Sequence, residues 1–389
     1  MSSRGLDRAA EVAVVGAGAI GLAVACQLRA AGIGPVLVVD ANPSPGLGSS
    51  SRANGGVRAQ FTTPINIEFS RYTIRALAEL DARTAGLVGF RPVGYLFMSG
   101  TEAGAGELRR GYELQRSLGL DVEWLSPQQV GEMVPFVERA GLRAVTCCSS
   151  DGLIDPHGVV SALWSEGRRL GVNYLFDTQV LALERRGETT LVRGSRVDIE
   201  ATHVVNAAGP FAADLAALAG IDLPVLPYRR NLACTEPVPG YPTAVPMCVD
   251  MDTGVLIRRE PSGGFVIAYS DPGDQPSRET SFDPGFLEAV ASRIGNRFPF
   301  LESVGIDQRK CWAGLYPETP DHHAIVDRSD GAPWFVQCAG FGGHGIMHSL
   351  AAGLAVAELI RDGRCTSFDI TPLRADRFGG DLQVETAVL

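Results

Sequence analysis

The sequence predicts an α/β protein, α+β overall, in which a Rossmann-like domain with a parallel sheet is joined to a second domain with a mostly antiparallel sheet. Two observations predict the first domain. A buried strand, a glycine-rich turn and a helix follow one another over residues 11–31, and the same succession recurs over residues 334–361. A third observation predicts the second domain, because aromatic and β-rich runs fill residues 90–146 and 224–310.

The first unit begins with an apolar run at residues 11–15 that leads directly into a glycine-rich turn and a helix over 22–31. In the turn, Gly16 permits a tight bend, Gly18 lets the backbone approach a pyrophosphate, and Gly21 lets helix and strand pack closely. The N-terminus of the helix then faces the anion. This arrangement predicts a dinucleotide site.

An acidic residue stands where such a site needs one. A second apolar strand over residues 36–39 ends in Asp40, about 20 positions after the glycines, at the spacing of a ribose-binding carboxylate. The unit recognises an adenosine diphosphate and therefore does not separate NAD from FAD. The contacts expected from it are Gly16, Gly18, Ala19, Ile20, Gly21, Asp40 and Ala41.

Two further segments favour FAD. Residues 46–58 form a hydroxyl- and glycine-rich run with two arginines, which suits a second clamp for the pyrophosphate and the ribityl chain. Residues 334–340 predict a strand that enters a second glycine-rich turn at 341–346, followed by an alanine-rich helix. Because a nicotinamide enzyme does not need this second unit, the expected cofactor is FAD.

With these motifs the chain resembles the D-amino acid oxidase (DAO) superfamily of FAD-dependent oxidoreductases over nearly its whole length. Within it, the similarity is to the branch of sarcosine oxidases, glycine oxidases and dimethylglycine-type dehydrogenases. The resemblance implies that the serine-rich run and two later strand ends lie beside FAD, and that the second turn recognises the flavin ring. The contacts carried over are Ser50, Ser51, Arg52, Gly55, Gly56, Val57, Val180, Ala207, Ala208, Gly209, Gly314, Gly340, Gly342, Gly343, His344, Gly345 and Ile346.

The same resemblance divides the chain into two domains. It implies an FAD-binding domain made of residues 1–89, 147–223 and 311–389, and a discontinuous substrate domain made of residues 90–146 and 224–310. The antiparallel sheet of the substrate domain would cover the flavin. The expected FAD is non-covalent, because the covalent cysteine of some relatives aligns nearer Gly314 than Cys311.

The resemblance implies an amine or amino acid oxidase or dehydrogenase. Such an enzyme oxidises the C–N bond of a secondary amine, or of a sarcosine- or glycine-like substrate, by hydride transfer to the flavin. The imine then hydrolyses, and the electrons pass to O2 or another acceptor. The candidate residues on the substrate side are Arg58, which can hold a carboxylate bidentately, and Tyr316, His323 and His344. Arg58 could equally contact the flavin or form an ion pair, and the histidines could instead pack in their turns.

Two positions depart from the sarcosine oxidase pattern. Monomeric sarcosine oxidases carry a lysine near the flavin that assists oxygen, and the corresponding residue here is Val266. They carry a second, carboxylate-binding lysine in the last turn, where this sequence has Met347. The resemblance therefore leaves both the electron acceptor and the individual substrate open.

Two other functions remain compatible with the sequence. An FAD-dependent oxidase or dehydrogenase of 2-hydroxy acids would use the same fold, with His323 or His344 as the base. A flavin-binding assembly factor, or a subunit of a larger dehydrogenase, would bind FAD without turnover of its own.

Composition limits the partners. A net charge of −10 gives no support to nucleic acid as a partner. The apolar run over residues 12–26 is too short for a membrane span, which needs about 18 or more apolar residues. The eight cysteines show no metal spacing, and His344 and His348 lack a third ligand, so no metal site is expected. The expected compartment is the cytoplasm, and the oligomeric state stays open.

Overall fold

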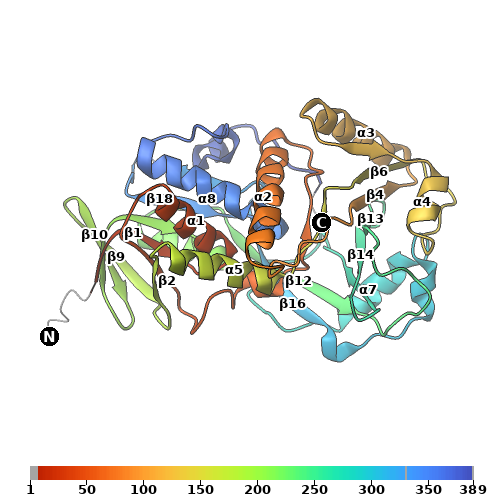
Figure 1. Cartoon of the computed structure of the whole chain (residues 1–389), viewed down its shortest axis with the longest axis horizontal. Coiled ribbons are helices and arrows are strands. Elements are labelled where there is room, and N and C mark those ends of the chain that lie inside the picture. Colours follow the sequence, from red (N-terminus) through yellow and green to blue (C-terminus); the bar gives the residue numbers. More distant parts are fainter. Residues whose placement is uncertain (1–7, 329–330, 388–389) are drawn as a thin grey trace.

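The structure of the chain is a computed structural model that describes residues 8–328 and 331–387. Two large sheets of eight strands each form its two halves, and helices cover their faces, as Figure 1 shows. The mixed α/β class predicted above is confirmed. The first sheet has the parallel centre, and the second is mainly antiparallel.

The strands of the first sheet follow the order β17-β18-β11-β1-β2-β8. In addition, β10 pairs antiparallel with β11, and β9 pairs antiparallel with β10. The pairs at its centre are parallel, whereas strand 17 runs antiparallel to strand 18. Its members are β1 (Arg8–Val15), β2 (Val36–Val39), β8 (Asn173–Leu175), β9 (Val180–Arg186), β10 (Thr189–Gly194), β11 (Ile199–Asn206), β17 (Ile325–Arg328) and β18 (Phe335–Ala339).

Helices enclose this sheet because its central strand is apolar on both faces. Successive side chains of a strand point to opposite sides, and Val12 and Val14 of β1 lie in one core whereas Ala13 and Val15 lie in another. On the first face, α8 packs on α1 and α2, and α5 packs on α1; α6 contributes to the second core. These helices are α1 (Ala19–Ala30), α2 (Pro64–Arg83), α5 (Pro156–Arg169), α6 (Ala212–Leu218) and α8 (Gly345–Asp362).

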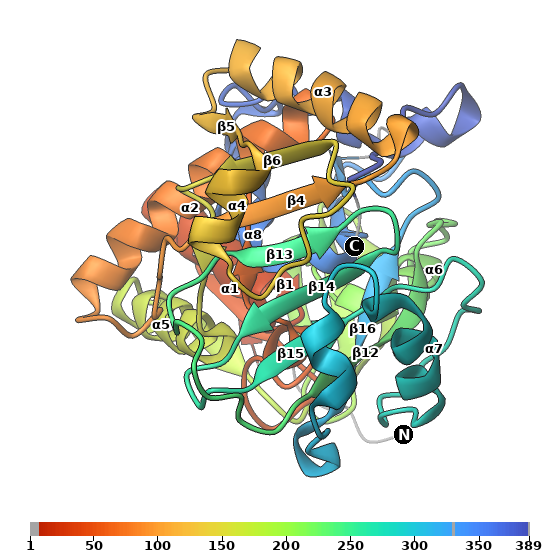
Figure 2. The same cartoon turned by 90° about the vertical axis from the view of Figure 1, so that its right-hand side faces the viewer.

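The second sheet follows the order 16-12-15-14-13-4-6-5, and Figure 2 shows it from the side of helices α3, α4 and α7. Strands 13 and 4 are its one parallel pair in the described chain. Its members are β4 (Tyr95–Ser99), β5 (Val122–Trp124), β6 (Ala144–Cys148), β12 (Leu226–Cys234), β13 (Met247–Asp250), β14 (Val255–Arg259), β15 (Phe265–Ala268) and β16 (Trp312–Glu318). The helices are α3 (Glu102–Ser117), α4 (Pro127–Met133) and α7 (Gly285–Ile294).

Two short strands, β3 (Gly56–Val57) and β7 (Gly152–Leu153), pair between the halves. We propose that the FAD-binding domain and the substrate domain named above correspond to the first and second sheets, with one exception. Strand β16 belongs by sequence to the third FAD-domain segment, 311–389, but pairs along its whole length with β12 of the second sheet. It is therefore the strand that brings the two halves together.

One predicted strand is wrong in its extent. Val180 was expected at the end of a strand beside FAD, but β8 ends at Leu175 and Val180 instead opens the separate strand β9. The chain turns at Asp177, whose φ of 52° is left-handed and whose N–H donates to the carbonyl of Asn42. A left-handed residue cannot continue an extended strand.

Within the described residues, one helical stretch, Gly342–Asp362, is long and apolar enough to cross a membrane by length and composition alone. Most of it is buried against the neighbouring helices, with 72% of its apolar window inside the protein. Its apolar character is thus explained by its place in the core.

Candidate functional site

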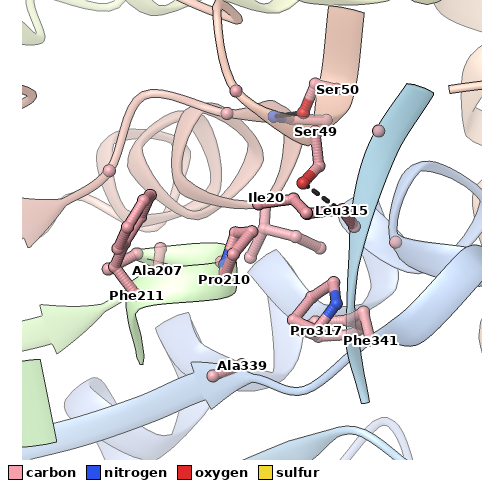
Figure 3. A pocket seen from close by; sticks show the side chains of 18 of the residues that line it. Ile20, Ser49, Ser50, Ala207, Pro210, Phe211, Leu315, Pro317, Ala339 and Phe341 are labelled. Carbon is pink, nitrogen blue, oxygen red and sulfur yellow. Dashed lines mark hydrogen bonds between the residues drawn. The ribbon is translucent and has the colours of Figure 1, made fainter. Parts of the chain in front are cut away.

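Both glycine-rich turns open into one cavity of about 870 Å³ between the two sheets. Figure 3 shows side chains from three distant parts of the chain around it: Ser49 and Ser50 at the top, Ala207 and Phe211 at the left, and Leu315 at the right, hydrogen-bonded to Ser49. The cavity is open to solvent, and it extends from the first glycine-rich turn and Asp40 to the second glycine-rich turn. Its size and position suit a dinucleotide and a small substrate.

The first turn has the geometry that an approaching pyrophosphate requires. Gly16 has a φ of 111°, and a Cβ atom there would lie 2.2 Å from the carbonyl oxygen of Ala207. Helix α1 has no capping side chain at Gly18. The N–H of Ala19 in its first turn donates to the Ser50 hydroxyl at 2.9 Å. The helix start lines the cavity at Gly18, Ala19 and Ile20, where an anion is favoured. Asp40 is fixed beside it, because its Oδ2 accepts from the N–H of Ala17 at 2.6 Å.

Hydrogen bonds attach the serine-rich run to strand β16. Within the run, Ser49–Arg52 form a 3-10 helix. The Ser49 hydroxyl donates to the carbonyl of Leu315 at 2.7 Å, and Arg52 Nη1 donates to that of Ala313 at 2.9 Å. In return, Trp312 Nε1 donates to the carbonyl of Arg52 at 2.9 Å. These bonds fix the run along one wall of the cavity.

The second turn forms the opposite end of the cavity. A Cβ atom at Gly343 would lie 2.4 Å from the ring of Tyr316, so only glycine fits between this ring and the turn. Helix α8 follows without a capping side chain, and Gly345, Ile346 and Met347 of its first turn line the cavity. Two helix N-termini and two crowded glycine turns that line one cavity fit FAD, with its pyrophosphate at α1 and its ring at α8.

The substrate end holds one buried cation. Arg58 is 3% exposed, and its guanidinium lies 3.9 Å from the centre of the Phe61 ring. Its two terminal nitrogens donate to the carbonyl oxygens of Gln60 and Ala387. Among residues 8–328 and 331–387, no carboxylate forms an ion pair with it. Its charge interacts electrostatically with the Glu385 and Asp151 carboxylates, without a direct ion pair in the described chain. A buried cation is costly without a close anion, and the cavity that Arg58 lines can admit an anion.

Burial keeps the other polar groups at this end neutral. Desolvation lowers the pKa of His344 to about 4, so the imidazole is uncharged at neutral pH. Its Nε2 lies 3.2 Å from the carbonyl oxygen of His322, and its buried Nδ1 has no partner within the described chain. Burial also raises the pKa values of Tyr95 and Tyr316, which keeps both as neutral hydroxyls.

His323 lies behind the wall of the cavity rather than in it. Its Nδ1 is 3.0 Å from the carbonyl oxygen of Asp321, and its Nε2 is 3.2 Å from the hydroxyl of Thr63. The ring is 1% exposed, and burial lowers its pKa. The structure therefore does not bring His323 together with the other three substrate-side candidates.

Most predicted contacts meet at this cavity. Arg58, Tyr316 and His344 line it on the substrate side. Of the expected FAD contacts, Gly21, Ser51 and Val57 are not among the lining residues. Those that do line it are Gly16, Gly18, Ala19, Ile20, Asp40, Ala41, Ser50, Arg52, Gly55, Gly56, Val180, Ala207, Ala208, Gly209, Gly314, Gly340, Gly342, Gly343, His344, Gly345 and Ile346.

Of the lining residues that the second sheet supplies, Gly314 and Tyr316 of β16 were named from the sequence, but the others were missed. Tyr95 of β4 and Leu256 of β14 line the cavity, and Met347 does so from α8. By contrast, Val266 of β15 is fully buried and does not line it. Residues 90–146 were assigned from the sequence to the β-rich runs of the second domain, and Tyr95 was not identified as a residue that lines the cavity. In the described chain, no group of three or more metal-ligating side chains occurs.

Comparison with known proteins agrees with this geometry. The family model described as FAD dependent oxidoreductase (DAO) matches residues 11–359. The "FAD-dependent oxidoreductase domain-containing protein 1" of Xenopus laevis is 28% identical over 415 residues, which cover 95% of this chain and 82% of that protein.

Two solved structures are similar over their whole length. The L-proline dehydrogenase of P. horikoshii superposes with a TM-score of 0.90 at 26% identity, covering 96% of this chain and 99% of the other. The glycine oxidase of Geobacillus kaustophilus gives a TM-score of 0.83 at 25% identity, covering 95% and 99%. The agreement extends through both sheets.

Proposed function

Since the chain belongs to the DAO family of FAD-dependent oxidoreductases, we propose that it oxidises the C–N bond of a small amine or amino acid that carries a carboxylate. The observation that carries this proposal is Arg58, a buried cation in the wall of the cavity at the end where the flavin ring fits. A secondary amine of the sarcosine type or a glycine-like amino acid has the required size and charge. The names of the two similar structures, a proline dehydrogenase and a glycine oxidase, support an amino acid as substrate.

Arg58 would bind the carboxylate. Two of its five N–H groups donate to backbone carbonyls, which are neutral acceptors. The carboxylates of Glu385 and Asp151 interact electrostatically with the guanidinium, but neither forms an ion pair with it within the described chain. A carboxylate in the cavity would supply a close anion and form charge-assisted hydrogen bonds. The bound carboxylate would then lie near Tyr95 and Tyr316, which line the same cavity as Arg58.

The remaining residues orient the substrate and exclude water. Leu256 and Met347 supply apolar surface, and the neutral Tyr316 ring packs on the second turn. When bound, FAD accepts two electrons and the hydrogen from the carbon next to the substrate nitrogen. The protein keeps that carbon near the cavity end formed by Gly343 and α8. The product imine then hydrolyses, and the electrons leave to O2 or another acceptor.

The histidines favour an amine over a 2-hydroxy acid. An alcohol needs a base to remove its O–H proton as the adjacent hydrogen leaves, whereas a neutral amine provides its own lone pair. The pKa of His344 is lowered to about 4, which makes it a weak base, and His323 does not line the cavity. Neither histidine has the position and basicity that the alcohol reaction requires.

Matched substrates test the role of Arg58. In the FAD-loaded protein, Arg58→Ala should raise KM for proline by roughly ten- to hundredfold, because the variant loses a hydrogen bond between two charged groups. The KM for pyrrolidine, which lacks the carboxylate, should change little. The control is Arg309→Ala, since Arg309 is exposed and lies outside the cavity. Equal losses for both amines, or none, would contradict the proposal.

A further inference from the structure

The C-terminal segment, residues 381–387, reaches the substrate end of the cavity. Residues 381–384 are exposed, but Glu385 is fully buried. The N–H of Glu385 donates to the carbonyl of Asp321 at 3.0 Å, and its side chain enters the start of α2. One buried carboxylate within an otherwise exposed segment indicates a specific attachment point.

The Glu385 carboxylate is surrounded by donors. It accepts from the N–H of Thr62 at 3.0 Å, from the hydroxyls of Thr62 and Thr63, and from Asn66 Nδ2 at 3.1 Å. These bonds lower its pKa in spite of its burial, so the group is ionised. An ionised buried carboxylate is stable only with such partners, and here most of them belong to a segment more than three hundred residues earlier.

The same carboxylate fixes the residue that contacts Arg58. The N–H of Ala387 donates to Glu385 Oε1 at 3.0 Å, and the carbonyl of Ala387 accepts from Arg58 Nη2. Gln60 supplies the other carbonyl, to Nη1. Each terminal nitrogen of Arg58 is thus held by one neutral acceptor and keeps a second N–H group. These two contacts orient the guanidinium through neutral oxygens. Glu385 and Asp151 also interact with its charge electrostatically, but without an ion pair in the described chain.

We infer that Glu385 is a positioning residue for carboxylate recognition. It fastens the C-terminal segment to residues 62–66, so that the Ala387 carbonyl holds the Arg58 guanidinium in the orientation that binds an anion. This inference rests on the proposed function of Arg58 as the carboxylate anchor. Glu385 itself does not line the cavity, and it acts on the substrate through Ala387 and Arg58.

The test uses two probes that differ in charge. Benzoate and benzamide are titrated into the FAD-loaded protein, and the change in the visible flavin spectrum gives the Kd of each. The variants are Glu385→Ala and Glu385→Gln, each alone and with Arg58→Ala. Asp381→Asn is the matched control, because it removes an exposed carboxylate of the same segment. Bound flavin per protein shows that each variant is folded.

The expected result is specific to the anion. Glu385→Ala should weaken benzoate binding at least about tenfold, since a charge-assisted contact loses its geometry, and should leave benzamide binding within about twofold. Glu385→Gln should weaken benzoate binding less than Glu385→Ala does, because the amide oxygen can still accept hydrogen bonds from some of the same donors. In the Arg58→Ala background, Glu385→Ala should have no further effect on benzoate, as expected for a residue that acts through Arg58.

Other results overturn the inference or its premise. Tighter benzoate binding after Glu385→Ala would mean that the segment competes with the ligand, and unchanged binding would mean that it only caps the fold. Either result overturns the role of Glu385 and leaves the proposed function standing if Arg58→Ala still weakens benzoate. Unchanged benzoate binding in Arg58→Ala would instead contradict Arg58 as the anchor. Should both Glu385 variants lose FAD, Asn66→Ala, which removes one donor, should give the same anion-specific loss on a smaller scale.

Discussion

At the scale of single residues, His344 links the site to the pH dependence of stability. Burial lowers its pKa from the ordinary 6.5 to about 4, and His348 beside it shifts in the same direction. The unfolded chain therefore binds a proton more readily than the folded one below pH 6.5. This contribution to stability is complete above pH 6.5 and is lost as the pH falls towards 4.

Replacement by a neutral side chain tests this relation. His344→Gln should reduce the loss of unfolding free energy between pH 7 and 4 by about 3 kcal/mol, because each pKa unit corresponds to about 1.4 kcal/mol. Denaturant unfolding at several pH values measures it. The exposed His157 provides the control, and His157→Gln should leave the slope unchanged. An unaltered acid slope in His344→Gln would show that the imidazole is protonated in the folded protein.

Sequence reasoning reached those residues whose role is local. Gly16, Asp40 and the turn around Gly343 could be predicted because strand, turn and helix are contiguous in the chain. Tyr95 and Glu385 could not, since each reaches the site only through the packing of segments that are distant in sequence. Arg58 could be named as a candidate from the sequence. That it is buried, and forms no ion pair with a carboxylate of the described residues, depends on the fold.

At the scale of elements, the first strand, turn and helix carry the cofactor. Gly16→Ala should weaken FAD binding at least about tenfold, because a Cβ atom would overlap the Ala207 carbonyl in a left-handed conformation, and overpacking costs about 1–3 kcal/mol. Equilibrium dialysis or flavin fluorescence measures the Kd.

Gly32 is the matched control for that substitution. It is also left-handed, with a φ of 80°, but no atom lies within 4 Å of the position its Cβ would take. Gly32→Ala should therefore introduce backbone strain but no steric overlap, and the Kd for FAD should stay unchanged. If the two variants lost FAD equally, backbone strain rather than the close approach to Ala207 would explain the effect.

The elements also show where prediction stops. Helices α1 and α8 and strands β1, β2 and β18 could be predicted from apolar runs and glycine turns. The break between β8 and β9 could not, because it depends on the left-handed Asp177 and its bond to the Asn42 carbonyl. The pairing of β16 with β12 likewise joins segments that a reading along the chain assigns to different domains.

At the scale of the whole molecule, FAD should act as a link between the two sheets, because residues of both line its cavity. At a free concentration a hundred times its Kd, FAD should stabilise the fold by about 2.7 kcal/mol. The midpoint of thermal unfolding should rise with FAD concentration. Riboflavin, which lacks the adenosine diphosphate bound by the first turn, should raise it less at equal concentration. Equal shifts would argue against the adenosine site at Asp40.

The central claim is that the bound flavin is reduced by a carboxylate-bearing amine. The most direct measurement is anaerobic mixing of the FAD-loaded protein with proline, N-methylglycine, glycine, pyrrolidine and lactate, followed by visible absorbance. At least one of the amino acids should bleach the flavin faster than pyrrolidine does, and lactate should leave it oxidised. Bleaching by lactate alone would identify a hydroxy acid enzyme, and a flavin that stays oxidised with every compound would contradict amine oxidation and favour a binding subunit.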